Sequence, residues 1–216
     1  MFVLDRGKRF VIPRTELTYP GHNMKLHQNA ADPVKSPVDH VMMDLEDACP
    51  YEFKGPKSRQ CVVEALNTLD FGKKVITVRP NNMRSEFFLG DMQAIVLGAP
   101  DKFHGIILPK VHGPDDIKYV SSLLDNLEKQ GGWKTRMQIE SLIEIPQALV
   151  KAYEIAMASD RMAGLILHCR LCRHAWHPRG SKEPEPQLPL CQAGSSGRGQ
   201  GRRLACRRQR LPTALA

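Results

Sequence analysis

Short, continuous apolar runs recur along the first 167 residues of this 216-residue chain. They are rich in Val, Ile and Leu and do not alternate with polar residues, which is typical of strands covered on both faces. The runs are 17–19, 41–43, 75–78, 105–108, 142–145 and 163–167. Most successive runs lie roughly 20–35 residues apart, which leaves room for the helical crossover that parallel strands need. The spacing therefore predicts a parallel α/β fold.

Three helices are predicted in the gaps by apolar residues at helical spacing. Each begins with a proline, which suits a first helical turn because its missing N–H would have no partner there. They begin at Pro56, Pro114 and Pro146, and glycines at 72 and 131–132 end the first two. In the third helix, Leu149, Ala152, Tyr153 and Ala156 are expected to face the core. No Gly-x-Gly-x-x-Gly follows any run, so a dinucleotide-binding fold has no support.

Charged residues cluster where several predicted strands end. They are Asp44, Glu46 and Asp47 after the second run, Arg79 after the third, Lys110 after the fourth, and Glu140 and Glu144 in the fifth. In parallel α/β folds, chemistry occurs at the carboxyl ends of the strands. Crowded carboxylates are tolerated where a cation or an arginine neutralises them. We therefore expect a charged site at this edge of the sheet.

Four motifs at these strand ends occur in a fixed order: DLEDACPYEFKGPKSRQCVVEALN, VITVRPN, GIILPKV and SLIEIPQAL. Over about residues 14–167 they resemble the HpcH/HpaI aldolase and citrate lyase β-subunit family, which includes the malyl-CoA lyases. The resemblance implies a TIM-type (β/α) barrel that works as a homo-oligomer, a trimer or hexamer. It also implies a metal-dependent carbon–carbon lyase or aldolase. Such an enzyme splits a 3-hydroxyacyl-CoA of the malyl-CoA or citryl-CoA type into an acyl-CoA and a 2-oxo acid through a metal-stabilised enolate.

The resemblance also assigns roles to particular residues. Glu144 would be the first carboxylate on Mg²⁺ (or Mn²⁺), a hard cation that prefers oxygen ligands. Arg79 would bind the 2-oxo acid and stabilise the enolate oxygen, a task that suits its planar fork. Glu46 and Asp47 would lie beside the metal and orient its waters and Arg79. Lys25, soon after the first strand, would help to hold the coenzyme A thioester.

Each of these residues also has a purely structural interpretation. Glu46 and Asp47 could form an ordinary polar strand end or a helix cap, and Arg79 could be an ion-pair partner of Glu46. A buried Glu144 needs a cation or an arginine partner in either case. Glu140 is expected to be solvated or salt-bridged. The resemblance does not imply a Schiff base at Lys110, and Asp44 is expected to point away from Glu46, so both are left out of the site.

The last 49 residues differ in composition from the rest. They hold nine Arg and one Lys against Glu183 and Glu185, which accounts for the whole net charge of +8, and four of the six Cys. No strand or helix is predicted there, and no carboxylate that could be a second metal ligand occurs between Leu167 and Glu183. We expect residues 1–167 to form an incomplete barrel of about six strands and 168–216 a disordered basic tail.

One hypothesis for this break is a change of reading frame or of splicing near residue 168. Loss of two barrel units would expose the first and sixth strands. The alternative to a lyase is then an inactive truncated barrel, or a nucleic-acid-binding protein that uses residues 198–210. The spacing within CRLCRHAWH, residues 169–177, does not suit zinc.

The partners that we expect are the 2-oxo acid and the acyl-CoA, with no nucleic acid and no membrane. No apolar run approaches the 18 or so residues of a membrane span. Apart from the initiator methionine, only three apolar residues precede Asp5, too few for the core of a signal peptide. These features predict a cytoplasmic protein with reduced thiols.

Overall fold

The structure, a computed structural model, describes residues 13–167. Six parallel strands form one sheet in chain order, so that each strand pairs with the next. They are β1 (Glu16–Pro20), β2 (His40–Asp44), β3 (Val75–Arg79), β4 (Gly105–Leu108), β5 (Gln138–Ile143) and β6 (Met162–Leu167). The predicted parallel α/β fold is confirmed, and over these residues the sheet is not closed into a barrel. The predicted tail, with its CRLCRHAWH segment and the basic stretch 198–210, lies outside the described residues.

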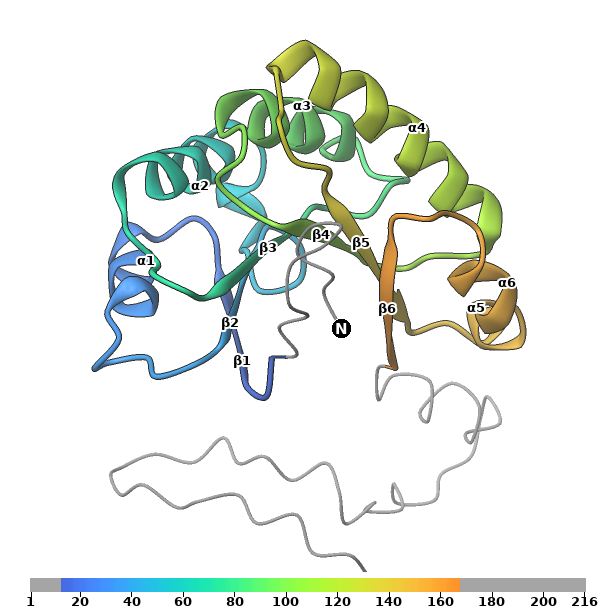
Figure 1. The fold of residues 1–216 in the computed structure, drawn as a ribbon, viewed down its shortest axis with the longest axis horizontal. Helices are drawn as coiled ribbons and strands as arrows, with labels where there is room; N and C mark the ends of the chain where they lie inside the picture. The colour runs from blue at the N-terminus through green and yellow to red at the C-terminus, as the bar shows by residue number, and fades with distance from the viewer. Residues whose placement is uncertain (1–12, 168–216) are drawn as a thin grey trace, which may run out of the picture. The chain divides into compact units, whose positions relative to one another are not determined.

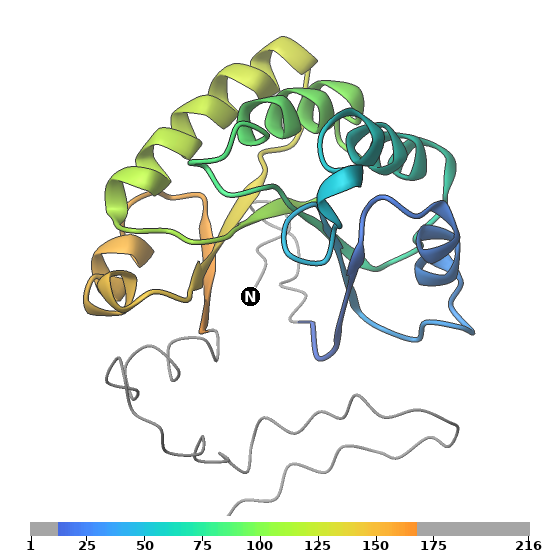
Figure 2. The same ribbon diagram turned by 180° about the vertical axis from the view of Figure 1, so that it is seen from behind.

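The helices lie on the convex side of the curved sheet (Figures 1 and 2). They are α1 (Met24–Ala31), the short 3-10 helix η1 (Tyr51–Phe53), α2 (Pro56–Thr68), α3 (Phe88–Gly98), α4 (Pro114–Gly131), α5 (Pro146–Val150) and α6 (Ala152–Ala156). The N-terminal prolines of α2, α4 and α5 stand where the sequence predicts them. Gly132 ends α4 in the left-handed conformation, which a glycine adopts without steric cost.

The two faces of the sheet carry different side chains, because successive residues of a strand point to opposite sides. Val41, Met43 and Val78 belong to the main core, together with the buried residues of the helices. Met42, Ile107 and Leu142 form a separate small cluster, against which Ile166 packs. Asp44 lies two residues beyond Met42 and is the register partner of Arg79. Alternation therefore carries both charged side chains to the face opposite the helices.

Two predicted elements differ from the structure. The fifth strand is Gln138–Ile143 rather than 142–145, because Gln138 and Glu140 pair in register with β4 although they are polar. Glu140 is buried, which excludes the solvated one of its two predicted states and leaves the salt-bridged one open.

The third predicted helix is interrupted at Lys151 and forms α5 and α6 instead. Leu149 and Tyr153, which were expected to face the core, are exposed, Tyr153 to 79%. Ala148 and Ile155 are buried in their place.

The first and sixth strands form the margins of the sheet in the described part of the chain. β2, β3 and β4 are buried along their whole length, whereas β1 and β6 are only partly covered. Leu167 is 70% exposed, and Val150 and Met157 of the neighbouring helical segment are exposed as well. The expected exposure of the marginal strands is thus confirmed. None of the described helices combines the length and the apolar character needed to cross a bilayer.

Candidate active site

Asp44 and Arg79 form a buried pair at the exits of β2 and β3. The Arg79 Nε donates to Asp44 Oδ1 at 2.7 Å and Nη2 donates to Oδ2 at 2.5 Å, a bidentate geometry. The register pairs these two residues directly across the strands. Burial opposes the charge on Arg79, but the hydrogen bonds and the charge of Asp44 outweigh it and raise the pKa of the guanidinium. Arg79 is therefore a fixed cation at this edge, and Nη1 makes no hydrogen bond to any described residue.

Asp44 also shapes the turn that carries Glu46. Its Oδ1 accepts a hydrogen bond from the Glu46 N–H at 2.8 Å, and its Oδ2 accepts one from the Ala48 N–H at 2.7 Å. The Leu45 N–H donates to the Arg79 carbonyl at 2.9 Å, which extends the contact between β2 and β3 by one residue. One carboxylate thus holds both Arg79 and the backbone of the DLED segment.

Lys110 connects the exits of β2, β4 and β5. Its ammonium forms ion pairs with Glu46 and, at 3.3 Å, with Asp47. Its backbone N–H donates to Glu144 Oε1 at 2.7 Å. The residue has a positive φ of 52°, in the left-handed region that side chains other than Gly, Asn and Asp rarely adopt. Three carboxylates from two separate strands are therefore bound to one residue.

The exit of β3 is anchored by a second polar network. Asp91 of α3, fully buried, accepts hydrogen bonds from the backbone N–H and the Nδ2 of Asn81 at 2.9 and 2.7 Å. Its other carboxylate oxygen accepts one from Arg59 Nε at 2.7 Å. Asn81 Oδ1 in turn accepts a hydrogen bond from the Lys54 ammonium at 2.7 Å. These contacts fix the chain directly after Arg79.

Glu46 is the most constrained carboxylate of the site. Its residue exposure is 2%, whereas the Asp47 side chain is 38% exposed. Burial raises the pKa of the Glu46 carboxyl; the hydrogen bond from Lys110 opposes this shift and the Asp47 charge reinforces it. Glu46 Oε2 is buried and has no hydrogen-bond partner among the described residues. A buried carboxylate oxygen in this state is a position at which a cation or a water would be stabilised.

The predicted site residues come together except for Lys25, and the residue that holds Arg79 differs from the prediction. Glu46, Asp47 and Glu144 meet at Lys110, and the charges of Glu46 and Asp47 also act on Arg79. Arg79 donates its side-chain hydrogen bonds to Asp44 and not to Glu46 or Asp47, so Asp44, and not those two residues, orients Arg79 by hydrogen bonds.

Lys25 is the exception. It is exposed in the first turn of α1, and within residues 13–167 no hydrogen bond or ion pair joins its ammonium to the carboxylates.

Asp44 and Lys110 are the functional candidates that sequence reasoning left out. The register of β2 against β3 pairs Asp44 with Arg79, and the two apolar runs, which differ in length, do not by themselves fix that register. For Lys110, burial lowers the pKa of the ammonium, but the hydrogen bond and charge of Glu46 outweigh it and raise the pKa. A lysine that forms an imine needs the opposite shift. The contacts of Lys110 therefore suit an electrostatic role.

The six charged side chains can be compared with the needs of a metal ion. With all four carboxyls ionised, Asp44, Glu46, Asp47, Glu144, Arg79 and Lys110 have a formal charge of −2 together. In the described part of the chain, no three His, Cys, Asp or Glu side chains are gathered in a way that could hold a metal by themselves. Mg²⁺ typically binds one or two carboxylates and keeps several waters. The charge and the oxygen donors thus fit such an ion, with water and substrate completing its coordination.

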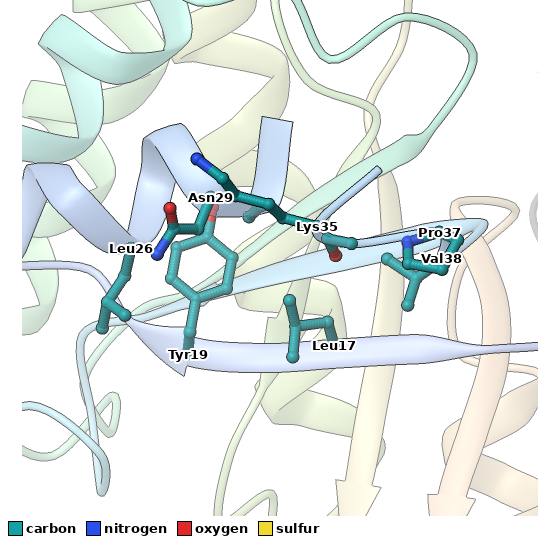
Figure 3. Close-up of a pocket in the computed structure, with 9 residues that line it drawn as sticks. Leu17, Tyr19, Leu26, Asn29, Lys35, Pro37 and Val38 are labelled. Carbon is teal, nitrogen blue, oxygen red and sulfur yellow. The ribbon is translucent and has the colours of Figure 1, made fainter. Parts of the chain in front are cut away.

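A cavity of about 270 Å³ lies elsewhere, between β1, α1 and the segment that follows α1 (Figure 3). Its walls include Leu17, Tyr19, Leu26 and Val38, and Lys35 lies beside them. None of the charged residues at the strand exits lines it. The candidate site is therefore the edge of the sheet and not this cavity.

The sequence profile of the HpcH/HpaI aldolase/citrate lyase family matches residues 14–185. The match begins where the motifs predict and continues past Leu167. The malyl-CoA/β-methylmalyl-CoA/citramalyl-CoA lyase of Chloroflexus aurantiacus is 36% identical over 149 residues, which are 69% of this chain and 42% of that relative. The chain thus spans less than half the length of this curated relative.

Two solved structures share the fold. A citrate lyase from Burkholderia xenovorans LB400 matches with a TM-score of 0.62 at 17% identity, over 77% of this chain and 52% of that one. The protein CitE from Mycobacterium tuberculosis, in complex with magnesium and acetoacetate, matches with a TM-score of 0.54 at 23% identity, over 74% of this chain and 56% of that one. At these identities the likeness concerns the fold alone, and it confirms the predicted TIM-type architecture.

Proposed function

The chain belongs to the HpcH/HpaI aldolase/citrate lyase family, and from this premise we propose that its strand exits form the active site of a carbon–carbon lyase. The substrate is a 3-hydroxyacyl-CoA of the malyl-CoA or citryl-CoA type, and the products are an acyl-CoA and a 2-oxo acid. One observation carries this proposal. Arg79 and Lys110, at the exits of β3 and β4, hold four carboxylates from the exits of β2 and β5, and the buried Glu46 Oε2 has no partner among the described residues.

A divalent cation, Mg²⁺ or Mn²⁺, completes the proposed site. Glu144 holds it directly, and Glu46 and Asp47 orient its water ligands. When bound, the cation acts as a Lewis acid on the carbonyl of the 2-oxo acid and as a template for it. The formal charge of −2 and the magnesium in the related CitE structure support this choice.

Arg79 binds the 2-oxo acid and stabilises negative charge that develops beside it. Asp44 occupies Nε and Nη2, so Nη1 is the donor that is left for a carboxylate or enolate oxygen. The pair is already assembled and buried, which avoids reorganisation when charge develops during the reaction. Asp44 therefore acts as the residue that positions Arg79.

The proposal extends to the thioester partner and to the assembly. Lys25 lies in the first turn of α1, after β1, with an exposed side chain that can meet a phosphate of coenzyme A. We place the protein in the cytoplasm as a homo-oligomer, a trimer or hexamer. The described cysteines, Cys49 and Cys61, are free thiols, which suits a reducing compartment.

Isothermal titration calorimetry on the full 216-residue chain tests this proposal. Heat is expected when oxaloacetate or glyoxylate is added with Mg²⁺ present, and not when either ligand is added alone. Glu144→Gln keeps an acceptor for the Lys110 N–H but removes the charge, and should weaken binding at least tenfold. Glu154→Gln, an exposed position on α6, is the matched control and should bind like the wild type. Absence of heat from the wild type with both ligands would refute the lyase assignment.

A further inference from the structure

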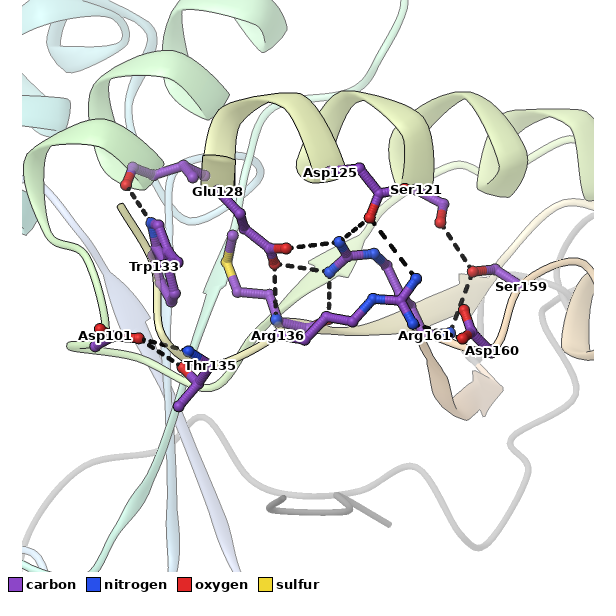
Figure 4. A network of polar contacts seen from close by, with 12 residues as sticks. Asp101, Ser121, Asp125, Glu128, Trp133, Thr135, Arg136, Ser159, Asp160 and Arg161 are labelled. Atoms are coloured by element: carbon purple, nitrogen blue, oxygen red, sulfur yellow. Dashed lines mark hydrogen bonds and ion pairs between the residues drawn. The ribbon is translucent and has the colours of Figure 1, made fainter. Parts of the chain in front are cut away.

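Lys110 has an unusual backbone for its residue type. Among the non-glycine residues described, positive φ occurs only at Asp101 and Lys110. Aspartate tolerates this region because its short side chain can bond locally. The Asp101 carboxylate indeed accepts hydrogen bonds from the Lys134 and Thr135 N–H groups at 3.0–3.1 Å, and the Thr135 contact is drawn in Figure 4. Lysine has no such local compensation, and a strained backbone of this kind is often retained for function.

The left-handed conformation turns the Lys110 N–H toward the next strand of the sheet. That N–H donates to Glu144 Oε1 at 2.7 Å, and Glu144 follows β5 directly. Glu144 is buried, so the orientation of its carboxylate depends on this hydrogen bond. The strained residue thus determines where the proposed metal carboxylate points.

The Lys110 side chain reaches in the opposite direction. Its ammonium contacts Glu46 and Asp47 beyond β2, and β3 lies between β2 and β4 in the sheet. Without a cation between them, two neighbouring carboxylates repel, and Asp47 is exposed enough to turn into water. The two ends of one residue therefore set the distance between Glu144 on one side and the Glu46–Asp47 pair on the other.

Taking the proposed function as given, we propose that Lys110 is the positioning residue of this site, which fixes Glu46, Asp47 and Glu144 relative to one another. Its backbone N–H and its ammonium act together, so a residue that retains only one of them does not replace it. Lys110 contacts no reacting atom in this scheme and does not act as a nucleophile.

The test compares Lys110→Gly with Lys110→Met in the full chain. Both lose the ammonium, but glycine relieves the left-handed strain. Lys110→Gly should therefore have a several-fold smaller unfolding constant in urea than Lys110→Met. Both variants should bind oxaloacetate at least tenfold more weakly than the wild type at a fixed excess of Mg²⁺. If Lys110 were only structural, the more stable Lys110→Gly variant would also recover oxaloacetate binding relative to Lys110→Met.

The control is Lys118→Met, which removes the same charge from an exposed pair with Asp115. It should bind oxaloacetate within twofold of the wild type. Binding by both Lys110 variants within twofold of the wild type would overturn the positioning role, while the lyase proposal would stand.

A double-mutant cycle separates this inference from the proposed function. Lys110→Met and Glu46→Gln, made singly and together, should show a coupling of about tenfold in the unfolding constant, since close charge pairs are coupled. This measurement needs no ligand, so it tests the role of Lys110 even if the wild type shows no binding heat in the calorimetric titration. A coupling below twofold would mean that Lys110 does not hold Glu46, and the inference would fail.

Discussion

Two clusters of charged residues lie at opposite edges of the same parallel sheet, and they are built differently. The first is the candidate site at the carboxyl ends of β2 to β5. The second is centred on Arg161, directly before β6, and is shown in Figure 4. Both combine buried arginine with carboxylates, yet only the first leaves a buried carboxylate oxygen, Glu46 Oε2, without a partner among the described residues.

In the second cluster, the acids are satisfied by arginine and backbone. Arg161 is buried and donates to both oxygens of Glu128, at 2.7 and 2.6 Å, and also contacts Asp125. Glu128 Oε1 accepts a further hydrogen bond from the Met137 N–H at 2.8 Å. The cluster therefore binds α4 to the starts of β5 and β6, and every carboxylate oxygen of Glu128 is used.

The difference indicates a division of tasks between the two ends of the sheet. In barrels of this kind, the amino-terminal end of the strands serves stability and the carboxyl end carries the chemistry. Carboxylates whose oxygens are all hydrogen-bonded suit the stabilising role of the amino-terminal end. At the carboxyl end, more acidic than basic side chains leave carboxylate oxygens that can bind a cation. Three measurements test this difference between the two clusters.

The largest effect is expected for Arg161→Met. Removing one partner of a buried ion pair leaves an uncompensated charge on Glu128, which costs roughly 3–5 kcal/mol of unfolding free energy. Urea denaturation measures this loss. The matched control is Arg136→Met, whose exposed side chain contacts Asp160 and Asp125; it should cost less than about 1 kcal/mol. Equal losses in the two variants would contradict a stabilising role specific to the buried arginine.

A smaller effect is expected for Arg79→Lys, and it should appear in binding. An ammonium cannot pair with Asp44 in the bidentate manner and also present a further donor to a ligand. Affinity for oxaloacetate at a fixed excess of Mg²⁺ should fall by about tenfold to a hundredfold, the usual worth of a hydrogen bond to a charged group. Arg84→Lys, in an exposed pair with Asp116, is the control and should change binding less than twofold. Unchanged affinity in Arg79→Lys would remove Arg79 from the site.

The smallest effect is expected at Glu140, on β5 between the two clusters. Burial raises the pKa of this carboxyl, so the folded protein holds its proton more tightly than the unfolded chain does. The contribution of Glu140 to wild-type stability should then fall as the pH rises above the ordinary glutamate pKa of about 4.3. Glu140→Gln has no such proton, so its stability relative to the wild type should increase as the pH rises over that window. Urea unfolding at several pH values checks this, and an unchanged difference between pH 4 and 7 would refute it.

Much of the fold could be predicted because its central strands are uniformly apolar. The runs 41–43, 75–78 and 105–108 are strands in the structure within one or two residues. The fifth strand was misplaced because its pairing with β4 includes Gln138 and Glu140, which an apolar pattern cannot reveal. The helix after Pro146 was predicted as one element because periodicity alone does not show the interruption at Lys151.

The candidate site was predictable in its location and less so in its contacts. Strand ends predicted that Glu46, Asp47 and Glu144 would meet, since parallel strands end at the same edge. The partner of Arg79 depends on the register between strands, which places Asp44 opposite it. The role of Lys110 depends on a left-handed backbone, and no sequence pattern in the GIILPKV motif indicates that conformation.

The order of the strands bears on how this chain acquires its structure during synthesis. Every strand pairs with the one that precedes it, so none must wait for a later segment to be inserted between two earlier ones. Short sequence separation between contacting elements favours rapid folding. The sheet can therefore grow outward from β1 as the polypeptide leaves the ribosome, and at each stage the newest strand presents the template for the next.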